Sequence, residues 1–148
     1  MATNSARGMR NNNPLNLRIS NNAWLGKVAH NTDGSFEQFT TLEHGLRAAI
    51  LNINTIVKRR KKQRLQTTIK DLICIWAPAA DNNNEESYVS TIHTYTQLPG
   101  NTIIDPANKN QICRIVWAMA IVECNERISF VRIENAYAMA HPCIMRKP

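Results

Sequence analysis

The chain has 148 residues, enough for one domain with a buried core, and 43% of them are hydrophobic. No apolar run approaches the roughly 20 residues of a membrane-spanning helix, and the N-terminus lacks the apolar stretch of a secretory signal. The formal net charge of +7 favours polyanionic partners such as nucleic acid, anionic lipid or bacterial wall polymers. We therefore expect one domain over residues 1–148, made in the cytoplasm without membrane insertion and with a flexible N-terminal segment, residues 1–10.

The N-terminal part of the chain predicts a small antiparallel sheet. Residues 11–14, Asn-Asn-Asn-Pro, are a turn signal, and apolar and polar residues alternate over residues 15–19 as they do in a strand. Two further strand-like stretches, residues 24–28 and 35–39, flank the turn sequence Asn-Thr-Asp-Gly at residues 31–34. Together these segments predict a hairpin or small sheet.

From residue 40 onward the hydrophobic spacing becomes helical. Thr40 to Glu43 fits a capping box, in which the threonine hydroxyl caps the third helical N–H and the glutamate reaches back. The cations at residues 58–64 are either the solvated end of this helix or a patch that binds phosphate or wall polymers. Further helices are expected at residues 67–76, 85–95, 105–125 and 129–139. The predicted fold class is α+β, mainly α.

The cysteines argue against a metal site. Cys74, Cys113, Cys124 and Cys143 form no CxxC pair, and no histidines stand at zinc-finger spacing. We expect free, buried thiols and no cofactor. A disulfide that joins Cys74 or Cys143 to one of the other two remains open.

Glu123 ends the most apolar helix of the chain. It follows Met119 by four residues and Val116 by seven, which places its carboxyl on the apolar stripe. Poor solvation there should raise its pKa and keep a proton available for general-acid chemistry. The alternative is a frayed helix end at which Glu123 turns to water.

The sequence lacks the motifs that other common catalytic chemistries require. The chain has no phosphate-binding GxxxxGK[ST] loop, no GxSxG elbow and no HExxH helix. A hydrolase or lyase centred on a glutamate remains, or a binding protein. Glu43 is the competing candidate acid, although the capping box already gives it a structural role.

Residues 7–18, Arg-Gly-Met-Arg-Asn-Asn-Asn-Pro-Leu-Asn-Leu-Arg, resemble the opening motif of a family of phage and bacterial proteins. These proteins are often labelled virion structural proteins and look like lysozyme-type wall hydrolases. Further matches are residues 39–48, Trp-Ala-Pro at 76–78, Asn82-Asn83 with Tyr88, and the helix that ends at Glu123. Because the resemblance covers residues 7–125, residues 127–148 are expected to form a C-terminal extension.

The chain also resembles a circularly permuted core of bacterial autolysin glucosaminidases and lytic transglycosylases. Those enzymes carry an apolar helix ending in a catalytic glutamate, then a short loop, a hairpin and a new helix. Here the helix that ends at Glu123 comes last in the sequence instead of first. The resemblance gives Glu123 the general-acid position and Glu43 the helix-opening position. Leu15, where the family has glycine, and Cys124, beside the acid, depart from the family pattern.

The resemblance implies a lysozyme-like helical domain that cleaves the glycan strands of peptidoglycan as a muramidase, glucosaminidase or lytic transglycosylase. Asp33, or else Glu37, would supply a second carboxylate from the hairpin, although Asp-Gly is also an ordinary turn pair. If neither reaches the site, one glutamate acts as acid and then base while a hydroxyl of the sugar attacks. Asn16, Arg18 and Tyr88 are expected in the sugar cleft.

The expected partner is bacterial peptidoglycan, and the basic surface would help the protein bind an anionic wall. The protein would act at the wall or in the periplasm after lysis, phage delivery or injection. It would serve either as a phage lytic protein or as an antibacterial effector toxin with a cognate immunity protein. A non-catalytic virion structural or wall-binding protein is the main alternative. Nucleic-acid binding is disfavoured because it rests on charge alone.

Overall fold

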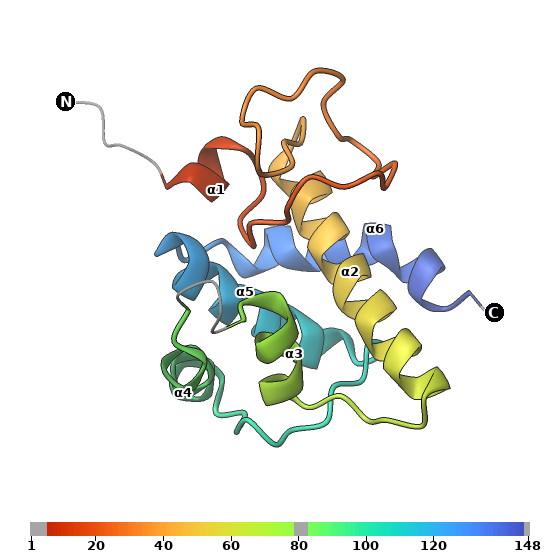
Figure 1. Ribbon diagram of the computed structural model, residues 1–148, viewed down its shortest axis with the longest axis vertical. Helices are drawn as coiled ribbons and strands as arrows, with labels where there is room; N and C mark the ends of the chain where they lie inside the picture. The colour runs from red at the N-terminus through yellow and green to blue at the C-terminus, as the bar shows by residue number, and fades with distance from the viewer. Residues whose placement is uncertain (1–5, 79–82, 147–148) are drawn as a thin grey trace.

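The computed structural model describes residues 6–78 and 83–146, and helices pack around one another to form the fold (Figure 1). Within these ranges there are six helices and no strand. In chain order they are α1 (Arg7–Arg10), α2 (Leu42–Lys62), α3 (Ile69–Trp76), α4 (Glu85–Thr96), α5 (Lys109–Cys124) and α6 (Phe130–Ile144). The prediction of an α+β class is therefore wrong, whereas the mainly helical character is confirmed.

The segment between α1 and α2 is a loop and not the predicted hairpin sheet. Its antiparallel pairing is limited to two isolated bridges, Arg18 with Phe36 and Lys27 with Phe39. The predicted strands do lie next to each other, but the paired backbone never extends into a ladder. In Figure 1 this loop forms a separate lobe above the N-terminal end of α2.

Asparagine side chains explain why the pairing stops. The buried Asn13 Nδ2 donates to the carbonyl oxygens of Leu17 and Glu37, at 2.9 and 3.0 Å. Asn13 Oδ1 accepts from the Leu17 N–H at 2.9 Å. One side chain thus satisfies backbone groups that would otherwise need a neighbouring strand.

The start of α2 differs from the predicted capping box by one residue. Thr41 is the N-cap, and its hydroxyl accepts from the His44 N–H at 3.1 Å. Glu43 is therefore the second helical residue, which cannot make the reciprocal bond. A capping box does occur at α3, between Thr68 and Asp71.

Two further helix ends differ from the sequence expectation. Helix α5 starts after Asn108 because the Asn108 side chain accepts from the Gln111 N–H at 3.1 Å. Helix α6 does not end near residue 139 but runs through Pro142 to Ile144. Pro142 has no N–H to donate to the Ala138 carbonyl, so the last turn lacks one helical hydrogen bond, while Ile144 beyond it is buried against the core.

Helix α5 forms the centre of the core, and α6 packs against both α2 and α5. The expected C-terminal extension is therefore part of the core. Its buried side chains are Ile133, Ala136, Tyr137, Ala140 and Ile144. The expected flexible N-terminus lies partly outside the described residues, and its later part, Arg7–Arg10, forms α1.

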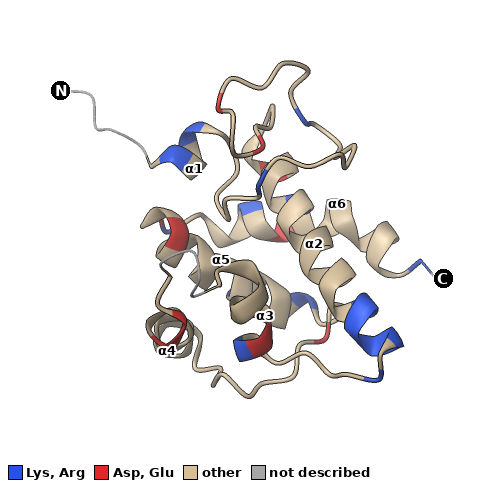
Figure 2. Ribbon diagram, viewed as in Figure 1, with Lys and Arg blue, Asp and Glu red and all other residues tan. Residues whose placement is uncertain are grey.

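All four cysteines are free thiols, as predicted, with Cys113 and Cys124 buried and Cys74 and Cys143 half-buried. The cationic residues gather at the C-terminal end of α2, as expected for a helix terminus (Figure 2). No helix in the described ranges is both long and apolar enough to cross a membrane.

Candidate active site

Glu123 lies in the last turn of α5, where the apolar stripe of this helix reaches the surface. Ile112, Val116 and Met119 on that stripe are at most 1% exposed. Asn125 then ends the helix in the left-handed conformation, with φ 53°. The helix therefore carries Glu123 from the core to the edge of a cleft, where its side chain is half-buried.

Asn16, Tyr88 and Glu123, which were all expected at the site, come together here. Asn16 Nδ2 donates to Glu123 Oε1 at 3.0 Å, and the Tyr88 hydroxyl donates to Glu123 Oε2 at 2.9 Å. They come from the N-terminal loop, from α4 and from α5. No lysine or arginine of the described chain forms an ion pair with Glu123.

The pKa of Glu123 depends mainly on the burial of its carboxyl, because no described cation is paired with it. Desolvation raises the pKa of Glu123, and the hydrogen bonds from Asn16 and Tyr88 offset part of that rise. Burial, together with the charge of the neighbouring carboxylate, raises the pKa of Tyr88 well above its ordinary value. Tyr88 therefore stays protonated, and its hydroxyl can donate to the carboxylate or accept from the carboxylic acid.

Local backbone geometry holds Asn16 in place. Its φ of 54° is left-handed, a conformation that asparagine tolerates better than most residues. Leu15, at a position where the proteins that the sequence resembles carry glycine, is fully buried in the core. The Trp76 indole donates to the Leu15 carbonyl oxygen at 2.9 Å. The unusual leucine thus anchors the loop instead of disrupting the site.

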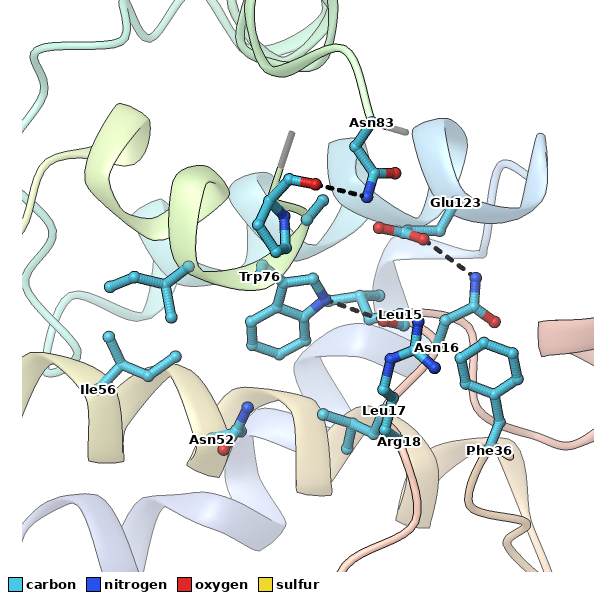
Figure 3. A pocket seen from close by; sticks show the side chains of 13 residues that line it. Leu15, Asn16, Leu17, Arg18, Phe36, Asn52, Ile56, Trp76, Asn83 and Glu123 are labelled. Carbon is cyan, nitrogen blue, oxygen red and sulfur yellow. Dashed lines mark hydrogen bonds between the residues drawn. The ribbon is translucent and has the colours of Figure 1, made fainter. Parts of the chain in front are cut away.

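Glu123 lines a cleft of about 430 Å³ that lies between the N-terminal loop, α2 and α3 (Figure 3). Its described lining is Leu15, Asn16, Leu17, Arg18, Phe36, Asn52, Ile56, Ile75, Trp76, Ala77, Pro78, Asn83 and Glu123. Among these residues Glu123 is the sole carboxylate. Arg18 lies over the Phe36 ring, 5.3 Å from its centroid. The cleft thus combines aromatic and apolar walls with a few polar groups, which is typical of a ligand-binding site.

Asp33, the predicted second catalytic carboxylate, does not line this cleft. The Arg7 guanidinium donates to both of its oxygens, at 2.6 and 2.7 Å, and Asn11 Nδ2 donates at 2.9 Å. It also accepts from backbone N–H groups of its own turn. These bonds hold the pKa of Asp33 far below its usual range, the Arg7 hydrogen bond first among them. This geometry suits a turn-stabilising anion.

Glu37 and Glu43 are likewise paired with cations away from the cleft. The Glu37 side chain is fully buried, and one of its oxygens lies 3.0 Å from Lys27 Nζ. Arg132 of α6 donates to both oxygens of Glu43, at 2.7 and 2.8 Å. This pairing lowers the pKa of Glu43. Neither residue is placed to share a substrate with Glu123.

Cys124, next to the candidate acid, has a packing role. Its Sγ donates to the Pro14 carbonyl oxygen at 3.1 Å, and burial raises the pKa of its thiol to about 11. It therefore carries no thiolate at neutral pH. No cluster of three His, Cys, Asp or Glu side chains suited to a metal occurs in the described part of the chain.

Sequence reasoning did not assign Phe36, Asn52, Ile56 or Asn83 to the cleft, although the structure places them there. The sequence held no usable signal for them, because α2 carries other polar residues beside Asn52, such as Asn54 and Thr55, and because the cleft depends on how the N-terminal loop folds over α2.

No protein-family model matches the chain. Over 100 residues it is 33% identical to Protein P5 of Pseudoalteromonas phage PM2. The match covers 66% of this chain and 59% of the length of Protein P5. The chain is thus similar to a phage protein over a part of each sequence.

Proposed function

We propose that this protein cleaves the glycan strands of bacterial peptidoglycan with Glu123 as the general acid. The observation that carries this proposal is the Glu123 carboxyl itself. It is half-buried at the edge of a polar cleft and bonded to the neutral donors Asn16 and Tyr88, with its pKa raised by desolvation. A raised pKa lets such a carboxyl hold its proton to higher pH, which favours transfer of the proton to a glycosidic oxygen.

A one-carboxylate mechanism fits this cleft better than a two-carboxylate mechanism. Glycoside hydrolysis by two carboxylates needs both groups within about 5–9.5 Å across the scissile bond. The described cleft offers Glu123 alone, while Arg7 and Arg132 neutralise Asp33 and Glu43 elsewhere. We therefore favour a lytic transglycosylase over a muramidase or glucosaminidase.

In that mechanism Glu123 acts twice. It first donates its proton to the bridging oxygen, and the bond from this oxygen to the anomeric carbon breaks. The carboxylate then takes the proton of a hydroxyl on the same sugar as that hydroxyl oxygen bonds to the anomeric carbon. An anhydro end forms, no water is consumed, and Glu123 is again protonated. The Tyr88 hydroxyl can hydrogen-bond to both forms of the acid throughout.

The biological setting is proposed from the similarity to a phage protein. A phage protein that cuts peptidoglycan would act in lysis or in penetration of the wall, and cationic residues at the end of α2 would favour an anionic wall. The effector toxin with an immunity protein stays a prediction. A non-catalytic phage structural or wall-binding protein is the second candidate, because similarity to a phage protein is equally consistent with it.

The deciding experiment incubates the wild-type protein and a Glu123→Gln variant with purified sacculi and identifies soluble products by mass spectrometry. We expect anhydro-ended fragments from the wild type and none from the folded variant. Reducing ends would instead indicate hydrolysis with Glu123 as acid. Sacculi that are bound tightly without release of fragments would replace the proposal with the structural or wall-binding protein.

A further inference from the structure

A second cavity, of about 360 Å³, adjoins the Glu123 cleft. Its described lining is Asn22, Ala23, Trp24, Asn52, Thr55 and Arg59. Asn52 lines both this cavity and the Glu123 cleft, so the two spaces meet at that side chain. Figure 3 shows Asn52 on α2, on the side of the cleft opposite Glu123.

The α2 residues of the two cavities follow one helix face. Asn52, Ile56 and Arg59 are spaced by four and three residues, a spacing that places side chains in a row. Asn52 lines both cavities, Ile56 lines the Glu123 cleft, and Thr55 and Arg59 line the second cavity. The helix therefore presents a continuous surface of about two turns, long enough for more than one sugar ring.

Trp24 gives the second cavity an apolar wall. It is half-buried and packs against the small cluster of Leu17, Phe39 and Ala48, against which Trp76 of the first cleft also packs. Two tryptophans thus adjoin one shared apolar cluster, each in its own cavity. The Trp76 indole N–H is occupied by the Leu15 carbonyl.

Arg59 lies at the C-terminal end of this row of α2 residues and lines the second cavity. It is exposed, and it forms no hydrogen bond or ion pair within the described ranges. Its neighbour Arg60, in contrast, is tied to Thr67 and Asp71. An arginine with a free planar guanidinium fits a carboxylate through two parallel hydrogen bonds.

We infer that the second cavity is a binding subsite for the sugar next to the one cleaved, with Arg59 pairing a carboxylate carried by the glycan. Trp24 packs on the apolar face of the ring, and the Asn52 amide bonds its hydroxyls between the two cavities. The inference rests on the proposed function, because its ligand is the glycan that Glu123 attacks, at stretches where an amidase has removed the peptides and freed the lactyl carboxylates. It goes further by assigning a preference for an acidic glycan over a neutral one.

The test measures binding by isothermal titration calorimetry in the Glu123→Gln background, so that the ligands stay intact. One probe is a neutral N-acetylglucosamine hexamer, and the other is amidase-stripped glycan strands that carry free lactyl carboxylates. We expect Arg59→Gln to weaken binding of the stripped strands about threefold to fivefold, as for an exposed ion pair, and to leave the neutral hexamer unchanged. Trp24→Ala should weaken both about tenfold.

Lys62→Gln is the matched control, since it removes one charge from the same end of α2 outside both cavities. An equal loss in Lys62→Gln and Arg59→Gln would overturn the subsite in favour of a diffuse basic surface. Unchanged binding in both Trp24→Ala and Arg59→Gln, with wild-type cleavage of sacculi intact, would overturn the subsite alone. Selective binding through Arg59 without any cleavage by the wild type would overturn the proposed function and leave the subsite as a binding site.

Discussion

The C-terminal end of α5 and the N-terminal end of α2 each carry a half-buried glutamate, and the two glutamates have opposite surroundings. Glu123 accepts hydrogen bonds from the neutral groups of Asn16 and Tyr88. Glu43 accepts two from the Arg132 guanidinium. Desolvation dominates in the first case and raises the pKa, whereas the cation dominates in the second and lowers it.

This difference separates the chemical role proposed for Glu123 from the structural role of Glu43. A carboxyl paired with arginine is held as an anion and gains stability from its partner, but it has no proton to give at neutral pH. A carboxyl buried among neutral donors gives up some stability and holds its proton to higher pH. Asp33, paired with Arg7, belongs with Glu43. Glu123 thus differs in its surroundings from both Asp33 and Glu43.

The largest expected effect tests this division directly. Glu123→Gln should lower the rate of glycan cleavage by about 10²–10⁴-fold, the usual contribution of a general acid. Glu43→Gln and Asp33→Asn should keep most of the wild-type rate per folded molecule, because neither residue lines the cleft. Rates of sacculus solubilisation, normalised to folded protein by circular dichroism, make the comparison. A rate loss in Asp33→Asn that matched Glu123→Gln would restore the two-carboxylate mechanism.

The second effect concerns the loop between α1 and α2, which carries Asn16 to the Glu123 carboxyl. Asn13→Ala removes three buried hydrogen bonds and leaves backbone groups of Leu17 and Glu37 without partners. We expect the free energy of unfolding to fall by about 2–4 kcal/mol. Urea denaturation measures this loss, and the exposed Asn101→Ala is the control. A loss below about 0.5 kcal/mol, the range of ordinary surface substitutions, would contradict the account of the loop.

A smaller effect is expected at Tyr88. The Tyr88 hydroxyl donates to Glu123 and so favours the charged carboxylate; Tyr88→Phe should therefore raise the pKa of Glu123 further. Because the acid must be protonated to act, the alkaline limb of the pH–rate profile should move to higher pH. We also expect a rate about tenfold lower, from the lost orientation of the acid. Tyr95→Phe, a partly exposed tyrosine outside the cleft, is the control. A limb that moved to lower pH would contradict this role.

The smallest effect is the stability cost of Glu43→Gln. The pair is partly exposed, with Arg132 at 47% and Glu43 at 25% side-chain exposure, so the loss should stay below about 1 kcal/mol at neutral pH. The lowered pKa of Glu43 means that this stabilisation is present above the ordinary glutamate pKa and disappears as the pH falls through the folded-state pKa. Unfolding curves of both proteins should therefore converge in acid. A constant difference across pH would rule out the charge pair as its cause.

The helices were predictable from sequence because apolar residues recur at helical spacing on α2, α3 and α5, and because threonine and asparagine caps mark several of their starts. The N-terminal sheet was wrongly predicted because alternation of apolar residues indicates strand pairing but does not reveal a side chain such as Asn13 that replaces it.

The candidate site was only partly predictable for a related reason. The apolar stripe of α5 places Glu123 on the buried side, but Asn16 lies 107 residues away in sequence, and periodicity cannot report such a contact. It was expected from the resemblance to wall hydrolases. The cation partners of Asp33 and Glu43 are also far away in sequence, at 26 and 89 residues, so the pattern could not show that both acids are paired with arginines.

The most direct test of this account is a nuclear magnetic resonance titration of the glutamate side-chain carboxyl carbons in the wild-type protein. Substitutions Glu123→Gln and Glu43→Gln would assign the two signals. We predict that Glu123 titrates above the ordinary glutamate pKa and Glu43 below it within the same molecule. A Glu123 signal that titrated at or below the Glu43 signal would contradict the claim that burial among neutral donors makes Glu123 the proton donor.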